Sequence, residues 1–270
     1  MLDLLCPVCG GRLVRKEKAW RCENHHCFDV ARSGYVNLLP PSASGKRHGD
    51  DKRMVAARTA FLSRGYYDHL IGAVAVACAQ AAGPDACVLD AGCGEGTYTR
   101  AIYDALAAKG GCPQLLGADI SAEAVRRAAR QVPEGIFCAA STAHLPLAAE
   151  SLDLIVNIFS PLMAEEFLRV LKPGGRLLAG LDNGFNYAFD EDETKIINTL
   201  PFNPLEDEGQ MRQLQKDDSG IQFSHTAHEQ LTGQLKAGLQ LLDLYEDTNG
   251  YGNLHAHNIP TYWATLARKA

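Results

Sequence analysis

Four cysteines and two adjacent histidines lie near the start of the chain, in the stretch CPVCGGRLVRKEKAWRCENHHC (residues 6–27). Cys6 and Cys9 are separated by two residues, so both thiolates can reach one ion from a tight turn. Cys22 follows after twelve intervening residues. The fourth ligand can come from His25, His26 or Cys27. The spacing therefore predicts a tetrahedral zinc site in a zinc ribbon, whereas a redox dithiol needs no second pair of ligands.

A lobe of about 35 residues has too little core to fold unaided, and structural zinc commonly supplies the missing stability. A site with four protein ligands leaves no open position for catalysis, so we expect the ribbon to shape a binding surface. Five basic side chains are available there for phosphate groups: Arg12, Arg15, Lys16, Lys18 and Arg21. They fit a solvated surface equally well.

The second chemical pattern is a glycine-rich turn in ACVLDAGCGEGTYTRAI (residues 86–102), which is typical of a buried strand, a turn and a helix start. Gly92, Gly94 and Gly96 let the backbone approach a ligand closely. Asp90 ends the strand, and Asp119 ends the next one, QLLGADIS (residues 114–121). We expect Asp119 to accept hydrogen bonds from two ribose hydroxyls, with a role as helix N-cap as the minor alternative.

The elements that position these residues alternate along the chain. Further strands are expected at 135–141, 152–161 and 170–180, and this succession predicts an α/β fold with a parallel sheet. Asp50 and Asp51 precede a helix that ends at Gly65 and whose apolar face is Met54, Ala57, Phe61 and Leu62. A second helix is expected at 68–82. Near the end of the chain, HTAHEQLTGQLKAG predicts a helix, and LQLLDLYED and TYWATLARKA predict a final antiparallel strand pair.

Composition limits the class of protein. A chain of 270 residues, 46% hydrophobic and 21% charged, can bury a large core and gives one full domain plus a small lobe. The first residues lack the pattern of a leader, and no run of roughly 18 apolar residues occurs, so we expect no membrane and a cytoplasmic protein. Residues 1–80 carry 12 Lys and Arg against 7 Asp and Glu, so this N-terminal part of the chain is the one suited to a polyanion.

The glycine turn, the paired acidic strand ends and the turn LKPGG closely resemble class I S-adenosylmethionine-dependent methyltransferases. The resemblance implies a Rossmann-like, mostly parallel seven-stranded sheet with S-adenosylmethionine as cofactor. It implies these cofactor contacts: Tyr67, Asp90, Gly92, Gly94, Gly96, Tyr98, Thr99, Asp119 and Ile120. A nicotinamide dehydrogenase is the alternative for this pocket alone, but the turn lacks its G-x-G-x-x-G spacing.

Residues 4–178 more specifically resemble the bacterial 23S ribosomal RNA guanine-N1-methyltransferases, through the ribbon, FDVARSGYVNLLP, HGDDKRMVAARTAFLSRGYYDHL and NIFSPLMAEEFLRVLKPGG. This resemblance implies zinc ligands at Cys6, Cys9, Cys22 and His26. Downstream, LDNGFNYAFDEDETK departs from the family by lacking its histidine. The C-terminal third resembles other small class I methyltransferases.

We therefore expect three parts: a zinc ribbon at 1–34, a linker with helices at 35–82 and the methyltransferase domain at 83–270. The expected function is methylation of guanine N1 in a hairpin of large-subunit ribosomal RNA, with that RNA as partner. The alternatives are methylation of a small metabolite or protein beneath a zinc-ribbon lid, and a non-enzymatic binding module. The oligomeric state, monomer or homodimer, stays open.

The catalytic candidates are polar groups near the expected pocket mouth. Removal of the guanine N1 proton calls for a carboxylate or histidine, and Asp50, Asp51 and His48 are available. Helix capping and solvent exposure are the competing roles for these three. Asn157 ends the fourth strand, where either a substrate contact or a strand-end hydrogen bond is expected. Asp50 and Asn157 are the two we select.

Overall fold

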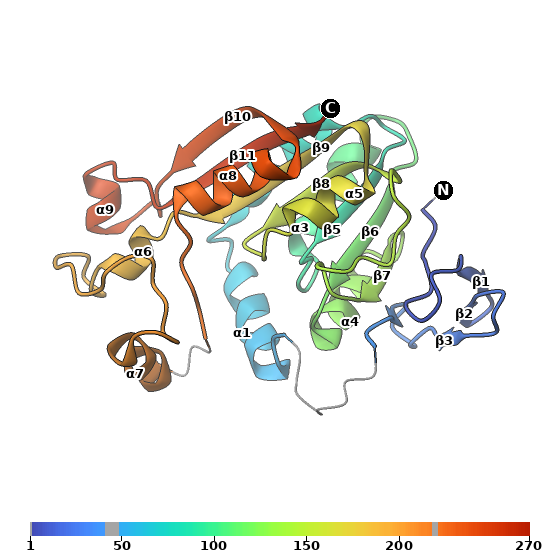
Figure 1. Ribbon diagram of the computed structural model, residues 1–270, viewed down its shortest axis with the longest axis horizontal. Coiled ribbons are helices and arrows are strands. Elements are labelled where there is room, and N and C mark those ends of the chain that lie inside the picture. Colours follow the sequence, from blue (N-terminus) through green and yellow to red (C-terminus); the bar gives the residue numbers. More distant parts are fainter. Residues whose placement is uncertain (1, 41–48, 218–220) are drawn as a thin grey trace. The chain divides into compact units, whose positions relative to one another are not determined.

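The computed structural model describes residues 2–40, 49–217 and 221–270 (Figure 1). His48, one of the candidate bases, lies outside these residues. The chain divides into two compact units, one of residues 1–178 with 268–270 and the other of residues 179–267. Each unit is described by itself. The three-part division expected from the sequence stays a prediction.

A parallel sheet forms the centre of the first unit. Its strands are β5 (Cys87–Ala91), β6 (Gln114–Asp119), β7 (Ile136–Ala139), β8 (Leu152–Ile158) and the first part of β9 (Leu171–Asp182). They lie in the order β9-β8-β5-β6-β7, and β5 pairs in parallel with both β6 and β8. Buried apolar residues fill these strands, as expected where helices cover both faces. The predicted class I methyltransferase fold is confirmed at this level.

One strand was not foreseen. β4 (Val36–Asn37) comes from the segment after the ribbon and pairs in parallel with β7, Val36 beside Cys138. It adds a strand to the seven that were expected. Because only two residues take part, no alternation of polar and apolar residues could reveal this strand in the sequence.

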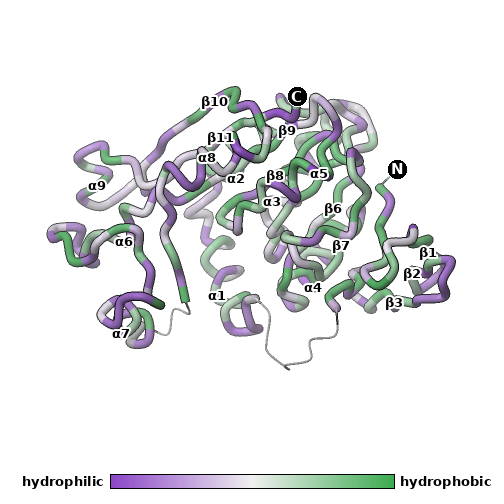
Figure 2. The backbone as a smooth tube through the Cα atoms, in the orientation of Figure 1, coloured by the Kyte–Doolittle hydropathy of each residue, from purple (hydrophilic) through white to green (hydrophobic). Residues whose placement is uncertain are grey.

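The helices of the first unit are α1 (Lys52–Leu62), α2 (Asp68–Ala81), α3 (Thr97–Ala107), α4 (Ala122–Gln131) and α5 (Ala164–Val170). Figure 2 shows hydrophilic and hydrophobic residues alternating along α4. Its apolar residues Val125 and Ala128 are buried in the core that also holds Phe137. Such alternation is the pattern of a helix with one buried face.

The expected apolar face of α1 is wrong. Met54 and Phe61 are each 43% exposed, and Val55 is the buried residue of this helix. The reason is the neighbour that α1 contacts: the Arg127 guanidinium of α4 donates to the Thr59 hydroxyl at 2.9 Å, so the helix turns its Val55 and Thr59 side inward. The predicted start is confirmed, because the Asp51 carboxylate caps it.

The ribbon is a three-stranded antiparallel sheet of β1 (Val14–Lys16), β2 (Ala19–Arg21) and β3 (Cys27–Asp29). It is attached to the remainder of the first unit by backbone contacts as well as by β4. Leu4 forms an isolated bridge with Leu147, and the Leu5 amide donates to the Pro146 carbonyl at 2.8 Å. The ribbon is therefore docked against the central domain.

The second unit contains the end of β9, α6 (Phe185–Ala188), α7 (Glu208–Asp217), α8 (Ala227–Ala237), β10 (Leu239–Asp247), α9 (Gly252–Ala256) and most of β11 (Tyr262–Lys269). The predicted C-terminal helix and strand pair are present, and Figure 1 shows β10 and β11 running in opposite directions. A capping box of Thr226 and Glu229 begins α8, and Gly238 ends it. Across the described residues, every helix is too short or too polar to cross a membrane.

Candidate cofactor and zinc sites

The glycine turn between β5 and α3 is held against the end of β6. The amides of Gly92 and Cys93 both donate to the Ala118 carbonyl, at 2.8 and 3.1 Å. Gly92, Gly94 and Gly96 all have positive φ, which side-chain-bearing residues rarely adopt. A Cβ on Gly92 would overlap the Ser160 side chain, and one on Gly96 would lie 2.7 Å from the Ala128 Cα, whereas one on Gly94 would meet open space.

The two predicted carboxylates lie at neighbouring strand ends. Asp119 accepts hydrogen bonds from the Gly94 amide at 3.0 Å and the Ser121 amide at 2.8 Å, so it joins the glycine turn to the next helix. Asp90 is buried and accepts from the Thr99 hydroxyl at 2.5 Å. Burial raises the pKa of Asp90 to about 7 and also raises the pKa of Asp119.

Aromatic side chains gather beside this turn. The Tyr67 ring lies 5.3 Å from that of Phe61 and 6.5 Å from that of Phe159. Phe159 follows β8 with φ of 51°, and together with Ser160 it was not singled out from the sequence. The motif NIFSPL contains both residues, but nothing in it signals a left-handed backbone. The buried Tyr98 hydroxyl has no hydrogen-bond partner among the described residues.

The two selected catalytic residues have different partners. The Asp50 carboxylate forms an ion pair with Arg58 at 2.8 Å and lies close enough to Asp119 to raise the pKa of that carboxyl. Asn157 is fully buried and donates to the Ala91 carbonyl at 3.0 Å, which is the expected strand-end bond. Its side-chain oxygen has no partner within the described part of the chain.

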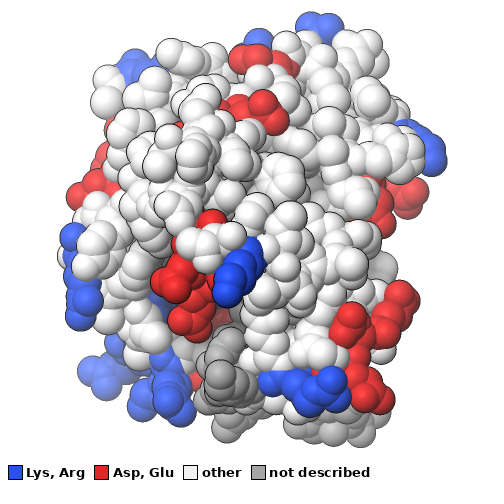
Figure 3. All heavy atoms as spheres, turned by 90° about the vertical axis from the view of Figure 1, so that its left-hand side faces the viewer, with Lys and Arg blue, Asp and Glu red and all other residues white. Residues whose placement is uncertain are grey.

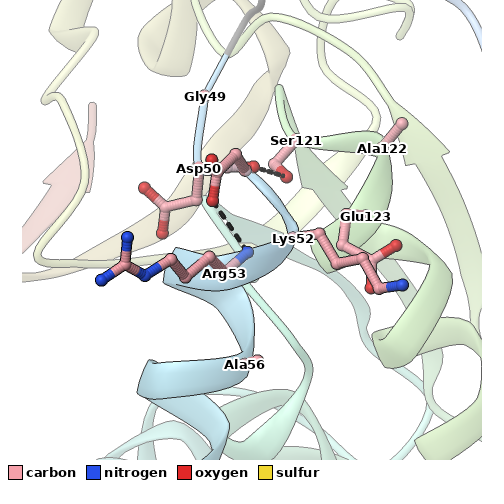
Figure 4. A pocket seen from close by; sticks show the side chains of 9 residues that line it. Gly49, Asp50, Lys52, Arg53, Ala56, Ser121, Ala122 and Glu123 are labelled. Atoms are coloured by element: carbon pink, nitrogen blue, oxygen red, sulfur yellow. Dashed lines mark hydrogen bonds between the residues drawn. The ribbon is translucent and has the colours of Figure 1, made fainter.

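A pocket of about 650 Å³ opens where the segment before α1 meets the start of α4 (Figure 4). The Ser121 hydroxyl donates to the Asp50 carbonyl at 2.6 Å, the contact drawn in Figure 4. A Cβ on Gly49 would lie 2.6 Å from the Ile120 side chain. The linker backbone thus packs directly on Ile120, one of the predicted cofactor contacts.

Three observations indicate that the residues around the glycine turn fit a nucleoside cofactor. The turn offers open space at Gly94, a Cβ-free approach of the kind that close ligand contact requires. Asp119 has two oxygens with further lone pairs for hydroxyl donors. Orphaned polar atoms of Tyr98 and Asn157 remain to be satisfied. Together, these features suit a ligand with hydroxyl groups and an extended polar end.

The ribbon brings together the four side chains expected to bind zinc: Cys6, Cys9, Cys22 and His26. The Cys9 and Cys22 sulfurs lie 3.7 Å apart, and the His26 Nδ1 lies 3.5 Å from the Cys6 sulfur and 3.4 Å from that of Cys22. Around a tetrahedral zinc ion with Zn–S bonds of about 2.3 Å, two sulfurs lie roughly 3.8 Å apart. The geometry therefore fits one zinc ion.

Two details support this ligand set. Cys27 lies in β3 and is exposed, and the cluster does not include it or His25. A hydrogen bond from the Asn24 side chain, together with the Gly11 amide, lowers the pKa of Cys9 to about 6, which favours the thiolate that a metal binds. The basic residues Arg15, Lys16, Lys18 and Arg21 are all exposed on the ribbon.

Comparisons with known proteins agree with both halves of this description. Residues 4–46 match the family model "RlmA, N-terminal", a zinc ribbon, and residues 88–175 match "Methyltransferase domain". A "putative 23S rRNA (guanine-N(1)-)-methyltransferase" from Micromonospora griseorubida is 40% identical over 195 residues, 65% of this chain and 64% of that protein. The "23S rRNA (guanine(748)-N(1))-methyltransferase" of Streptomyces fradiae is 40% identical over 178 residues, 65% of this chain and 61% of its own.

The chain thus spans less than two thirds of the length of these relatives. Among solved structures, an S-adenosylmethionine-dependent methyltransferase from Mesorhizobium loti superimposes with a TM-score of 0.53 at 20% identity, over 70% of this chain and 92% of that one. A likeness at this identity shows the fold. The chain therefore joins an RlmA-type N-terminal zinc ribbon to a domain of the class I methyltransferase fold.

Proposed function

We propose that this protein is an S-adenosylmethionine-dependent methyltransferase that acts on N1 of a guanine in a hairpin of large-subunit ribosomal RNA. The observation that carries the proposal is the RlmA-type ribbon in front of the methyltransferase fold, in a chain that is 40% identical to relatives named for this reaction. The hydrogen bonds from Gly94 and Ser121 to Asp119 support a pre-formed place for the cofactor ribose. Ribosomal RNA as substrate implies a cytoplasmic protein.

Bound S-adenosylmethionine supplies an activated methyl group, so the chain must mainly hold guanine N1 in line and exclude water. Formation of the N1–carbon bond accompanies cleavage of the sulfur–carbon bond, and the N1 proton leaves to a base. We propose Asp50 for this proton, since its carboxylate lies near Asp119, the expected ribose contact. Asn157 would contact the cofactor or substrate through its unpaired oxygen.

The test is transfer of radiolabelled methyl from S-adenosylmethionine to large-subunit ribosomal RNA, to a matched hairpin and to a metabolite extract, with nucleoside analysis. We expect label in 1-methylguanosine. Asp119→Asn should weaken binding of S-adenosylhomocysteine in calorimetry. Asp104→Asn is the matched control, because Asp104 is an exposed residue of α3 paired with Arg100.

Two results would count against the proposal. If the label appeared only in small molecules, the protein would instead be a metabolite methyltransferase whose ribbon is a lid. Absence of any heat with S-adenosylhomocysteine, together with binding of a nicotinamide dinucleotide, would overturn the enzyme class itself.

A further inference from the structure

A second cavity, of about 440 Å³, lies within residues 179–267. Ligand pockets typically have volumes of about 300–1,000 Å³. Its walls come from the end of β9, from α6 and α7, from the loops that hold Phe202 and Gln222, from the loop before α9 and from the start of β11. None of the residues that line this cavity belongs to the cofactor site or the zinc site, so the cavity has no role in the proposed reaction.

Aromatic rings form much of the wall. Tyr187 of α6 stacks on the buried Phe202, with ring centroids 5.0 Å apart and planes 26° from parallel. Tyr262 also lines the cavity, and so does Tyr251, which is 75% exposed. Stacked and rim-exposed rings of this kind offer flat faces to a planar ligand.

A chain of side-chain hydrogen bonds at this cavity ends on the carboxylate of Asp182. The Thr261 hydroxyl donates to the Asn249 oxygen at 2.7 Å, the Asn249 amide donates to the Asn186 oxygen at 3.2 Å, and the Asn186 amide donates to Asp182 at 3.0 Å. The Gly184 amide donates to the other oxygen of Asp182. These three bonds run toward Asp182, and the Asn249 amide also donates to the Glu193 carboxylate at 3.2 Å, so both amide orientations and the Asp182 carboxylate are fixed.

A carboxylate held in this way accepts hydrogen bonds and donates none, and its two oxygens have lone pairs beyond those already used. The ligand must then present hydrogen-bond donors, N–H or O–H, and two adjacent donors on a flat ring suit both the carboxylate and the aromatic wall. Guanine carries two adjacent donors, N1–H and the N2 amino group, on one edge of a flat ring. Adenine and cytosine place an acceptor beside their amino group, and uracil places its one N–H between two carbonyls.

We propose that this cavity binds an unstacked guanine base other than the one that is methylated, with its ring against the tyrosines and its N1–H and N2–H edge on the Asp182 carboxylate. Reading of an extruded base by such an edge and by aromatic stacking is a general mode of recognition. Most of the face in Figure 3 consists of residues that are neither acidic nor basic, with groups of Asp and Glu among them. The inference rests on the proposed function in one respect: an RNA substrate is the source of the guanine.

The experiment uses the full chain with guanosine 5′-monophosphate and inosine 5′-monophosphate, which differ by the N2 amino group. Ligand-observed NMR titration should show a preference of about tenfold for the guanosine nucleotide, the size expected when one of two paired donors is lost. Asp182→Asn should remove the preference, because its amide presents an N–H to an N–H. Asp243→Asn, at an exposed position of β10, is the matched control and should keep it.

A merely structural role for Asp182 would weaken both nucleotides equally, and that result would overturn the inference. If Asp182→Asn fails to fold, Tyr251→Ala replaces it, since that exposed rim side chain should weaken both nucleotides without unfolding the unit. Equal binding of the two nucleotides to the unaltered protein would likewise refute the guanine site.

The two proposals fail separately. Methyl transfer to RNA without guanine-selective binding would support the proposed function and refute the guanine site. Guanine-selective binding that depends on Asp182, without methyl transfer to RNA, would support the guanine site and refute the proposed function.

Discussion

Individual glycines of the cofactor turn have separable roles. Gly94→Ala should lower the free energy of unfolding by only about 1–2 kcal/mol, the cost of a left-handed conformation, because its Cβ meets open space. It should nevertheless weaken binding of S-adenosylhomocysteine, since the methyl group occupies the approach. Gly96→Ala should cost about 1–3 kcal/mol more through overpacking against Ala128. Urea unfolding and calorimetry on both variants check this; equal losses of stability would contradict it.

The buried carboxyl group of Asp90 should make the free energy of unfolding depend on pH, and comparison with a variant isolates this effect. Its pKa in the native protein, about 7, lies above the ordinary value of 3.8, so the native state binds the proton more tightly than the unfolded chain. The stabilisation is therefore complete below about pH 4 and is lost as the pH rises through 7. Relative to Asp90→Asn, the protein should become less stable by a few kcal/mol across this interval.

Urea unfolding of both proteins at pH 5, 6, 7 and 8 provides the measurement. The loss of the hydrogen bond from Thr99 shifts the variant by a constant amount, so only the change with pH is diagnostic. A difference that stays constant from pH 5 to 8 would show that Asp90 titrates normally.

At the scale of elements, the ribbon depends on its metal. Cys9→Ser should reduce zinc from one ion per chain to a small fraction and unfold β1 to β3, since so short a lobe lacks a core of its own. Binding of S-adenosylhomocysteine should persist, because Asp90 is held by Thr99 of α3 and Asp119 by Gly94 of the glycine turn, all outside the ribbon. Metal analysis and limited proteolysis are the measurements.

Cys27→Ser is the control for this experiment. Cys27 lies only five residues beyond Cys22 and is exposed, but it is outside the cluster. Loss of zinc from this variant would move the fourth ligand away from His26.

The sequence allowed some elements to be predicted and concealed others. The strand, glycine turn and helix from Cys87 were evident, because a glycine pattern and an acidic strand end mark a local backbone requirement. The buried face of α1 was missed because its packing is decided by a hydrogen bond from Arg127, which lies on another helix. The zinc ligands were found because they are close in sequence, whereas the residues that line the cavity at Asp182 are scattered between positions 182 and 262.

At the scale of the whole molecule, charge should govern RNA binding. Reversal of Arg15 and Lys16, both exposed on β1, to Glu should weaken binding of the ribosomal hairpin and reduce the salt dependence of the affinity by about one to two phosphate contacts. Affinity for S-adenosylhomocysteine should not change. Fluorescence anisotropy between 50 and 200 mM salt measures this, where phosphate contacts have large effects. Lys236→Glu, on the exposed last turn of α8, is the control.

The short pairing of β4 with β7 also bears on how the chain is made. Val36 and Cys138 are partners about a hundred residues apart, so synthesis exposes the ribbon long before its partner strand exists. Chains emerge at about 5–20 residues per second, which gives the four metal ligands several seconds in which to capture an ion before docking begins. A cell starved of zinc would then complete chains whose β7 edge has no neighbour, and an unpaired strand edge is a template for aggregation. Metal supply during translation, more than the stability of the finished protein, would set the yield.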